Sequence, residues 1–317
     1  MAVNVYYSSD ASAPSLSGTA GALVSVLDAC LVNGYGSKGG AGWTIAYTAT
    51  NKRAYLQGAG SSGMVLYIDD TGVATVNEAL ATGFESMSSI TAGLGQFPLT
   101  SQVNLGGVFG GAVMWRKTVN ATVRNWTVVA DSTCFYVFME SGDVTSPVSA
   151  QTGYFGDIFP FKASDSYKPL LIGFNGNSNT ASYFPVCCSN TNLTVNGHYM
   201  PRTWTGAGTS INVGKLAFAP AFGNNSSLGN PGTGIFSYPN GPDGGLYLAP
   251  VHVVHSSAMR GYMKGLWSPQ QNQPANHNDV FTGTGNMSGK TFLVQNVVNS
   301  GGGSGSQVFI EISNTWG

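Results

Sequence analysis

The hydrophobic pattern of this chain is strongest over residues 125–140, which read NWTVVADSTCFYVFME. Apolar residues lead into a turn-forming Ala-Asp-Ser sequence at 130–132, and every position over 134–138 is apolar. A strand with one face in water alternates apolar and polar residues, so a strand that is apolar on both faces needs cover on both sides. The pattern predicts a tight β-hairpin in the middle of a core, covered by a second sheet or a helix.

One segment, residues 17–36, has helical spacing instead. Four apolar residues recur on one face at that spacing: Leu23, Leu27, Cys30 and Leu31. Ser17 or Thr19 can cap the start, and Gly34 can take the left-handed conformation that ends a helix. We therefore predict one short helix over 19–33. Its apolar face needs a partner, and the central hairpin is the natural candidate.

Short strands between turns account for most of the remaining chain. Apolar segments bounded by turn residues predict strands or short strand-like pieces at residues 3–7, 43–47, 53–57, 64–69, 73–78, 112–117, 145–149, 155–161, 170–174, 215–219, 245–254, 259–267, 291–298 and 307–312. The 112–117 strand is expected to pair beside the central hairpin, and the last two strands are expected to pair with each other. The predicted fold class is all-β, a β-sandwich or a barrel-like fold, with one short N-terminal helix.

Two regions are predicted along the chain: an N-terminal β domain over 1–174, which includes the helix, and a C-terminal β region over 175–317. The segment 175–196, rich in Asn, Ser and Thr, marks their border, and one continuous domain is the alternative. A chain of this length buries about three quarters of its unfolded surface, so core size limits neither arrangement. The residues predicted to be decisive for packing and turns are Leu27, Leu31, Trp126, Phe138, Gly241 and Gly244.

Charge is scarce in this sequence. Charged residues make up 9% of the chain, the formal net charge is −1 and the pI is about 6.4, so there is no basic excess for binding nucleic acid or an anionic membrane. With 42% hydrophobic residues, weak self-repulsion favours packing against neighbouring chains. The 44 glycines follow no three-residue period, which excludes collagen and is typical of turns and bulges in a strand-rich fold.

The cysteines and the N-terminus give information about the cellular compartment. Cys30 and Cys134 lie in apolar segments and Cys187 and Cys188 are adjacent, so we predict buried thiols rather than a disulfide framework. The N-terminal sequence MAVNVYYSSD lacks the basic region and apolar stretch of a signal peptide. No segment has the apolar length of a membrane span. We expect synthesis in a cytoplasm.

Two glycine-rich motifs resemble phosphate-binding loops. Residues 58–63 fit the dinucleotide pattern G-x-G-x-x-G, but that chemistry needs a helix N-terminus at the pyrophosphate, and here a strand is predicted to follow. Gly289, Lys290 and Thr291 resemble the end of a P-loop, yet the position of its leading glycine is occupied by Thr284. Neither motif predicts a nucleotide site, and no cofactor is expected.

The triplet Asp70-Thr71-Gly72 follows an apolar strand, as the active-site triplet of aspartic proteases does. Two such carboxylates must share a proton, so an enzyme of this kind would have to be a homodimer. The apolar segment at 170–173, which could serve as the accompanying element, is too far along the chain for the small dimeric enzymes. A plain hairpin turn matches the triplet equally well, and this is our interpretation.

The histidines do not predict a metal site. His252 and His255 are three residues apart on a predicted strand, so their side chains point to opposite faces unless the strand has a bulge. His277 and Asp279 lie in a polar loop. Surface or interface histidines are the expectation, with zinc binding as the alternative.

Sugar stacking by aromatic residues is a further alternative that the sequence leaves open. The candidates are Tyr6, Tyr7, Trp204 and Trp267, although aromatic residues of all-β proteins belong to cores or interfaces more often than to ligand sites. The sequence contains no G-x-S-x-G and no H-E-x-x-H motif. We predict no catalytic, cofactor-binding or metal-binding residue, and no enzymatic activity.

Several sequence blocks resemble a known group of proteins. They are SAPSLSGTAGALVSVLDACLVNGYGSK at 12–38, AGWTIAYTATNKRAYLQG at 41–58, LYIDDTG at 66–72, GDIFPF at 156–161, SYPNGPDGGLYLAPVHV at 237–253, RGYMKGLW at 260–267, GKTFLV at 289–294 and ISNTW at 312–316. Together they resemble uncharacterised virion structural proteins of tailed bacteriophages and prophages. The resemblance implies a place in a phage particle rather than a reaction, because that group has no agreed catalytic residues. The chain departs from it near Arg260, where members of the group are more basic and richer in His.

Two classes of function follow from the composition and the resemblance. The first is a non-enzymatic virion component, homo-oligomeric and attached to the tail or baseplate, with head decoration on the capsid as its variant. Its partners are other virion proteins and copies of itself. The second is a receptor- or glycan-binding tail protein that meets a host-surface glycan. If the first class is correct, changing single carboxylates to Asn should leave infectivity largely intact, and the residues chosen for this test are Asp69, Asp70, Asp157, Asp165 and Asp243.

Overall fold

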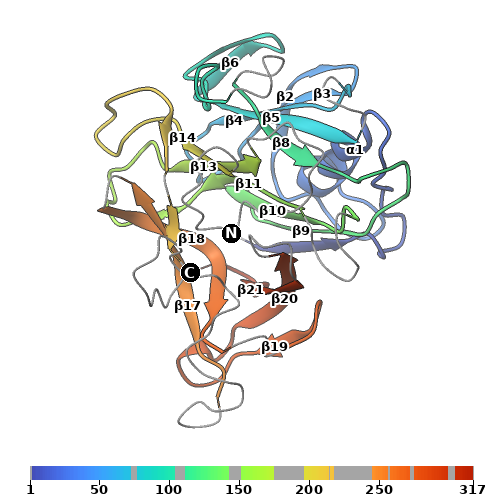
Figure 1. Cartoon of the computed structure of the whole chain (residues 1–317), viewed down its shortest axis with the longest axis vertical. Coiled ribbons are helices and arrows are strands. Elements are labelled where there is room, and N and C mark those ends of the chain that lie inside the picture. Colours follow the sequence, from blue (N-terminus) through green and yellow to red (C-terminus); the bar gives the residue numbers. More distant parts are fainter. Residues whose placement is uncertain are drawn as a thin grey trace.

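Two antiparallel sheets and a small two-stranded hairpin build the computed structural model of this chain (Figure 1). It describes residues 2–72, 77–103, 111–142, 151–174, 196–213, 215–217, 245–255, 258–271, 275–298 and 304–316. Strand accounts for 48% of the residues and helix for 7%, so the all-β prediction with one N-terminal helix is confirmed. The predictions at 73–76, 145–149, Cys187, Cys188, Gly241 and Gly244 lie outside the described residues.

The first sheet contains twelve of the described strands and includes a curled half-barrel. Ten of them lie side by side in the order β1 (Asn4–Tyr7), β9 (Trp126–Ala130), β10 (Cys134–Met139), β11 (Gln151–Asp157), β13 (Pro169–Phe174), β8 (Val113–Arg116), β5 (Glu78–Phe84), β4 (Val65–Asp69), β3 (Lys52–Leu56) and β2 (Thr44–Ala49). Outside this row, β14 (Asn196–Met200) pairs with β13, and β15 (Ile211–Asn212) pairs with β14.

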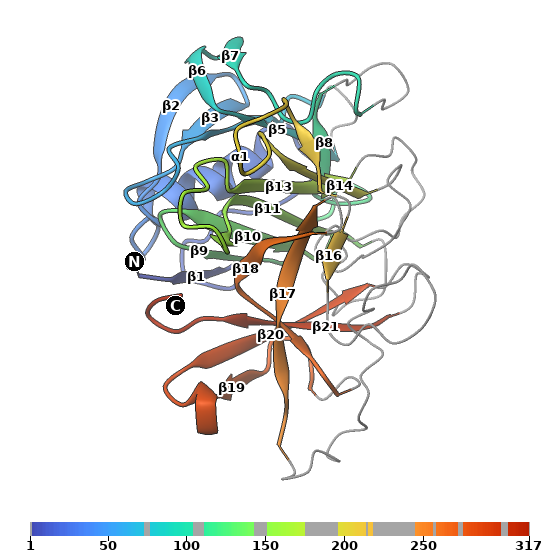
Figure 2. The ribbon, with the colours of Figure 1, turned by 90° about the vertical axis from the view of Figure 1, so that its left-hand side faces the viewer.

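The helix packs against the apolar side of this curled sheet (Figure 2). It comprises α1 (Ala22–Leu27) and a π-helical continuation, η1 (Asp28–Asn33). The predicted apolar face, from Leu23 to Leu31, is fully buried in one core with residues of β9 and β10, and η1 contacts β9 directly. The predicted contact between helix and central hairpin is therefore confirmed.

The second sheet covers the opposite side of the first. Its row of strands is β16 (Lys215–Ala217), β17 (Leu248–His255), β18 (Ala258–Pro269), β21 (Ser304–Glu311), β20 (Thr291–Val298) and β19 (Val280–Thr282), and β12 (Phe159–Pro160) pairs with β18. The pairing of β20 with β21 confirms the predicted final hairpin. The remaining elements are the hairpin β6 (Ser86–Ser89) and β7 (Ala92–Leu94), and a 3-10 turn, η2 (Gly285–Met287).

The two faces of the central hairpin enter two different cores. Phe135 and Val137 lie in the core that contains the helix, whereas Tyr136 and Phe138 lie in the core shared with the second sheet. This alternation is the period-two geometry of a strand. Cover on both faces is thus confirmed, by the helix on one side and by the second sheet on the other.

One prediction about strands is wrong, and another falls mostly outside the described residues. Of the strand expected over 73–78, positions 73–76 are not described, and the strand that is described there, β5, begins at Glu78 and runs to Phe84. Its small buried residues Ala79 and Ala81 give little β propensity, which hides it in the sequence. The strand near 112–117, β8, pairs with β5 and β13 rather than beside the hairpin, because β11 and β13 lie between it and β10.

Strands before and after residue 174, the end of the predicted N-terminal domain, pair within the same sheets. β14 and β15 follow this position and belong to the first sheet, whereas β12 precedes it and pairs with the second. Both ends of the chain lie at the junction of the sheets (Figure 1), where the Val3 amide donates to the Asn314 carbonyl at 3.0 Å. Trp316 is buried there with its ring edge-on to Tyr136.

Candidate functional site

Almost every described carboxylate is used inside the protein. Of the 14 acidic residues, Asp143 and Asp243 lie outside the described residues. Nine of the other twelve form ion pairs with Lys or Arg. Glu140 faces His277, and the remaining two, Asp131 and Asp279, accept backbone N–H groups in turns. The scarce charges of this chain therefore act mainly as internal ties.

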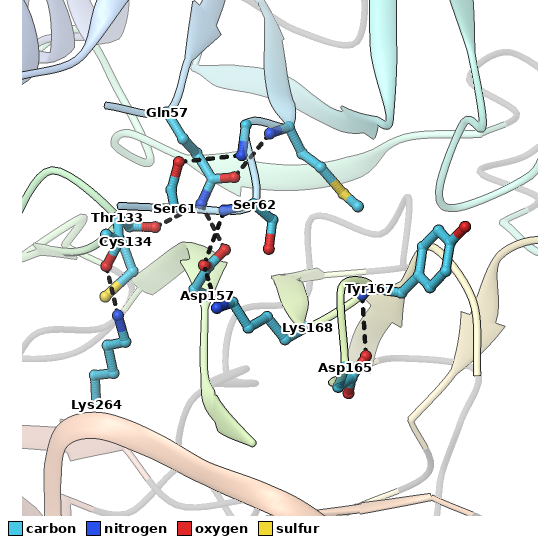
Figure 3. A network of polar contacts seen from close by, with 12 residues as sticks. Gln57, Ser61, Ser62, Thr133, Cys134, Asp157, Asp165, Tyr167, Lys168 and Lys264 are labelled. Atoms are coloured by element: carbon cyan, nitrogen blue, oxygen red, sulfur yellow. Dashed lines mark hydrogen bonds and ion pairs between the residues drawn. The ribbon is translucent and has the colours of Figure 1, made fainter. Parts of the chain in front are cut away.

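The densest group of such ties is an interior polar network between the β3–β4 loop, the turn of the central hairpin and the end of β11 (Figure 3). Asp157 is its fully buried carboxylate. It accepts hydrogen bonds from Gln57 Nε2 and from the Ser62 amide, both at 3.0 Å, and lies 3.4 Å from Lys168 Nζ. Three donors of the same chain thus surround this carboxylate, so its oxygens are used inside the protein.

A lysine of the second sheet extends this network across the junction. Lys264 of β18 is buried, and its Nζ donates to Thr133 Oγ1 at 2.6 Å in the turn between β9 and β10. Thr133 in turn donates to Asp131 Oδ1 at 2.7 Å. The Lys264 ammonium also lies 5.1 Å from the centre of the Phe159 ring. This chain of contacts joins the two sheets, so its first role is to fix their relative position.

The one thiol in this network is not reactive. Cys134 is completely buried, and burial raises the pKa of its thiol well above the usual value. Since the thiolate is the nucleophilic form, Cys134 is inert. Burial likewise raises the pKa of the Cys30 thiol in the other core. The prediction of buried thiols is confirmed for these two cysteines.

A second buried ion pair holds two surface loops against β18. Arg260 donates from Nε and Nη2 to the two oxygens of Asp165, at 2.8 and 2.9 Å, and both side chains are buried. Its remaining donors reach the backbone carbonyls of Tyr167 and Arg202, both at 2.6 Å. Arg260, the first residue of the sequence block at 260–267, is thus a buried structural residue and not an exposed cation.

The third buried pair lies under the start of the helix. Lys117 Nζ is 2.5 Å from Asp70 Oδ1, and neither side chain is exposed. The other oxygen, Oδ2, accepts the amides of Leu23 and Val24 at 2.8 and 3.3 Å. Asp70 therefore caps the helix from a distant part of the chain. Burial is the largest influence on this carboxyl and raises its pKa, against the effect of Lys117 and the amides.

This finding corrects the predicted helix start and explains the Asp-Thr-Gly triplet. The N-cap position is Gly21, with φ of 81°, and neither Ser17 nor Thr19 caps the first turn. Asp70 lies in the bend after β4 and has a lysine partner instead of a second carboxylate. The triplet lies in the connection between β4 and β5, whose residues 73–76 are outside the described ranges, so the hairpin turn stays a prediction. Sequence reasoning missed the buried charge, whose only local signal is a polar pair, Asp69 and Asp70, at the end of an apolar strand.

A strand follows each of the two glycine-rich motifs: β4 follows the first and β20 begins at the end of the second. Residues 58–63 connect β3 to β4, and the Ser62 amide binds the protein's own Asp157. In the second motif, Lys290 pairs with Glu311 and Thr291 begins β20. Neither segment leads into a helix, so neither offers the geometry of a phosphate site.

The histidines do not converge on a metal-binding arrangement. His252 and His255 lie on β17, where pairing with β18 has irregularities, and burial lowers the pKa of both. His277 accepts the Asn296 amide at Nδ1. Within the described ranges, no group of three or more His, Cys, Asp or Glu side chains could hold a metal ion.

The four aromatic candidates have different environments. Tyr6 is fully buried, Tyr7 is half-buried, and Trp267 is half-buried with its ring edge-on to Phe292. Trp204 is exposed. Only this last residue keeps the accessibility that sugar stacking needs.

Comparison with known proteins adds no assignment. Neither the protein-family models nor the curated proteins searched gave a match to this sequence. Within the part of the chain that the structure describes, no helix has the length and apolar character needed to cross a bilayer.

Proposed function

We propose that this chain is a non-enzymatic structural protein of a tailed-phage virion, homo-oligomeric and attached to the tail or baseplate. The non-enzymatic part of the proposal is supported by the ion pairs that the carboxylates form within the protein. Acid–base catalysis by carboxylates needs such groups in a cleft with room for substrate. Here nine of the twelve described ones are neutralised by Lys or Arg of the same chain.

The surface supports an assembly role. Ionic steering and long-range repulsion are weak when most charges are paired internally and the net charge is −1. Several large apolar side chains remain exposed among the described residues: Leu94, Val119, Val123, Met259 and Val280. A virion component can cover such positions with neighbouring subunits, and many repeated contacts give a stable assembly without strong single ones.

The phage part of the proposal depends on the sequence blocks that resemble virion proteins. It is tested by mass spectrometry and cryo-electron microscopy of the purified particle from the phage or prophage that encodes this chain. Copies in a ring or spike on the tail are the expected result. Copies on the capsid lattice would replace the tail assignment by head decoration, and absence from purified particles would refute the proposal.

Three of the five aspartates chosen for the Asp→Asn test of infectivity are unsuitable for it. Asp70, Asp157 and Asp165 are buried ion-pair partners, so their replacement by Asn lowers stability whatever the function is. Asp69 pairs with Lys52 in a half-buried position and is the better choice. Infectivity retained in Asp69→Asn, with the folded protein present in particles, is the result expected of an assembly protein.

A further inference from the structure

Two exposed aromatic side chains are brought together by two loops, one after β12 and one between β14 and β15. Among the large apolar residues exposed in the described ranges, the aromatic ones are Phe161 and Trp204, with 56% and 48% exposure. They are linked by Lys162, which follows Phe161 in sequence and places its Nζ 3.6 Å from the centre of a Trp204 ring. We call Phe161, Lys162 and Trp204 the aromatic surface.

The Phe161 side of this surface continues as a row of rings. The Phe161 ring is 5.9 Å from that of His252 and 6.1 Å from that of Tyr262, centre to centre. Its backbone amide donates to the Arg260 carbonyl at 2.9 Å, which fixes the chain beside β18. Because burial lowers the pKa of His252, this imidazole is neutral near pH 7 and adds no charge to the row.

The Trp204 side is a preformed turn. The Thr203 amide donates to the Ala207 carbonyl at 3.1 Å and the Gly206 amide to the Thr203 carbonyl at 2.9 Å. The Thr203 hydroxyl lies 2.9 Å from that of Thr205, donates to the Ala207 carbonyl and accepts the Ala207 amide, the last two both at 3.1 Å. Because the turn is held by its own hydrogen bonds, a ligand that stacks on Trp204 loses little free energy in ordering the loop.

The buried ion pair described above sets the position of both sides. Asp165 lies in the loop that carries Phe161 and Lys162, and Arg260 binds it together with the Arg202 carbonyl, two residues before Trp204. Arg260 is therefore a positioning residue for the aromatic surface. Such internal support is what a binding site needs in order to keep its geometry before the ligand arrives.

We propose that the aromatic surface binds an acidic saccharide. A sugar ring has an apolar C–H face that packs on exposed aromatic rings, and hydroxyls that can pair with the exposed Thr205. Lys162 has no carboxylate partner among the described residues, so its ammonium is available to a carboxylate or phosphate on the sugar.

A protein partner fits this surface less well. A standard protein interface buries about 800 Å² on each side around an apolar centre. Of the other exposed apolar residues, Leu94 of β7 and Val280 of β19 lie at opposite ends of the molecule in Figure 2, so they form no continuous apolar centre with each other. Two exposed aromatic residues with one cation match a saccharide better.

The test uses the full chain on an array of neutral and acidic oligosaccharides, followed by titration of the best binder. Trp204→Ala and Phe161→Ala should each weaken binding by about tenfold or more, since each removes a stacking ring. Lys162→Met should weaken acidic saccharides and leave neutral analogues unchanged. Leu94→Ala is the matched control, because it removes an exposed apolar side chain elsewhere.

Two outcomes would overturn this inference: no binding to any saccharide on the array, or binding that survives both ring deletions in variants with unchanged thermal melting. Specific capture of another virion protein through Trp204, without saccharide binding, would also overturn it in favour of an assembly contact. The inference is independent of location in the particle. Saccharide binding can therefore fail while the virion assignment stands, and the reverse also holds.

Discussion

One Asp–Lys pair lies at the start of the N-terminal helix and another lies just past its end, and the two pairs have opposite environments. At the start, Asp70 and Lys117 are 2.5 Å apart and completely buried. Just past the end, Asp10 and Lys38 are 2.6 Å apart with side chains 21% and 33% exposed. The chemistry and the distance are nearly the same, so the comparison isolates the effect of solvent.

Solvent reverses the direction of the pKa shift. For Asp70, loss of water is the largest influence and raises the pKa despite Lys117 and two backbone donors. For Asp10, burial also acts to raise the pKa, but hydrogen bonds from Lys38, the Tyr7 amide and the Tyr35 hydroxyl together lower it. A short ion pair is therefore no measure of its own stabilising effect.

The largest expected effect comes from breaking the buried pair. Asp70→Ala leaves the Lys117 charge in the core without its partner, at a cost of about 3–5 kcal/mol. The Leu23 and Val24 amides also lose their acceptor, which adds about 1 kcal/mol. The free energy of unfolding in urea measures this loss. Asp70→Asn combined with Lys117→Met should restore part of the stability, and a loss below about 1 kcal/mol in Asp70→Ala would contradict the role of Asp70.

Truncation of a buried aromatic side chain gives a reference for the loss of stability in Asp70→Ala. Phe138 is 1% exposed in the core between the sheets and lies parallel to the Tyr136 ring. Phe138→Ala should reduce the free energy of unfolding by about 3–5 kcal/mol through lost burial and a cavity. The equivalent change on the helix side, Phe135→Ala, is the matched variant. A loss below about 1 kcal/mol for Phe138→Ala would mean that the second sheet does not cover this face in solution.

The sequence could predict the burial of the central hairpin but not the residue that caps the helix. Burial of the hairpin on both faces was predictable, because a continuous apolar run records both faces of one strand in one stretch of sequence. The cap of the helix was not, since Asp70 lies 47 residues from Leu23 and looks locally like a turn residue. Propensity describes neighbours in sequence, whereas this cap depends on how β4 is placed in the sheet.

The polar network at the sheet junction was hidden for the same reason. Lys264 and Asp157 each appear as single charged residues inside apolar segments. This pattern indicates a buried polar contact but does not identify the partner residue. Their contacts, Thr133 for Lys264 and Gln57 for Asp157, lie in connections far away in the sequence. Strand order was missed likewise, because antiparallel pairing leaves no mark in the sequence that specifies a non-consecutive neighbour.

A pH titration should show the two aspartates acting in opposite directions. Asp70 has a folded-state pKa above its ordinary value of 3.8, so the folded state binds more protons there, and its contribution to stability falls as pH rises through that window. Asp10 has a lowered pKa, so its contribution is present above 3.8 and is lost as pH falls through the lower folded value. Carboxyl NMR titration of both residues measures this directly. Shifts in the same direction would refute the environmental explanation.

The smallest effect should come from breaking the exposed pair. Asp10→Ala removes a partly solvated ion pair, for which the expected loss in the free energy of unfolding is about 1 kcal/mol or less. Lys38 keeps access to water and to the Val5 carbonyl, so no buried charge is left behind. A double-mutant cycle with Lys38→Met should give a coupling energy well below that of the Asp70–Lys117 pair. Equal coupling energies would show that the distance between the charges, and not their exposure, determines the strength of each ion pair.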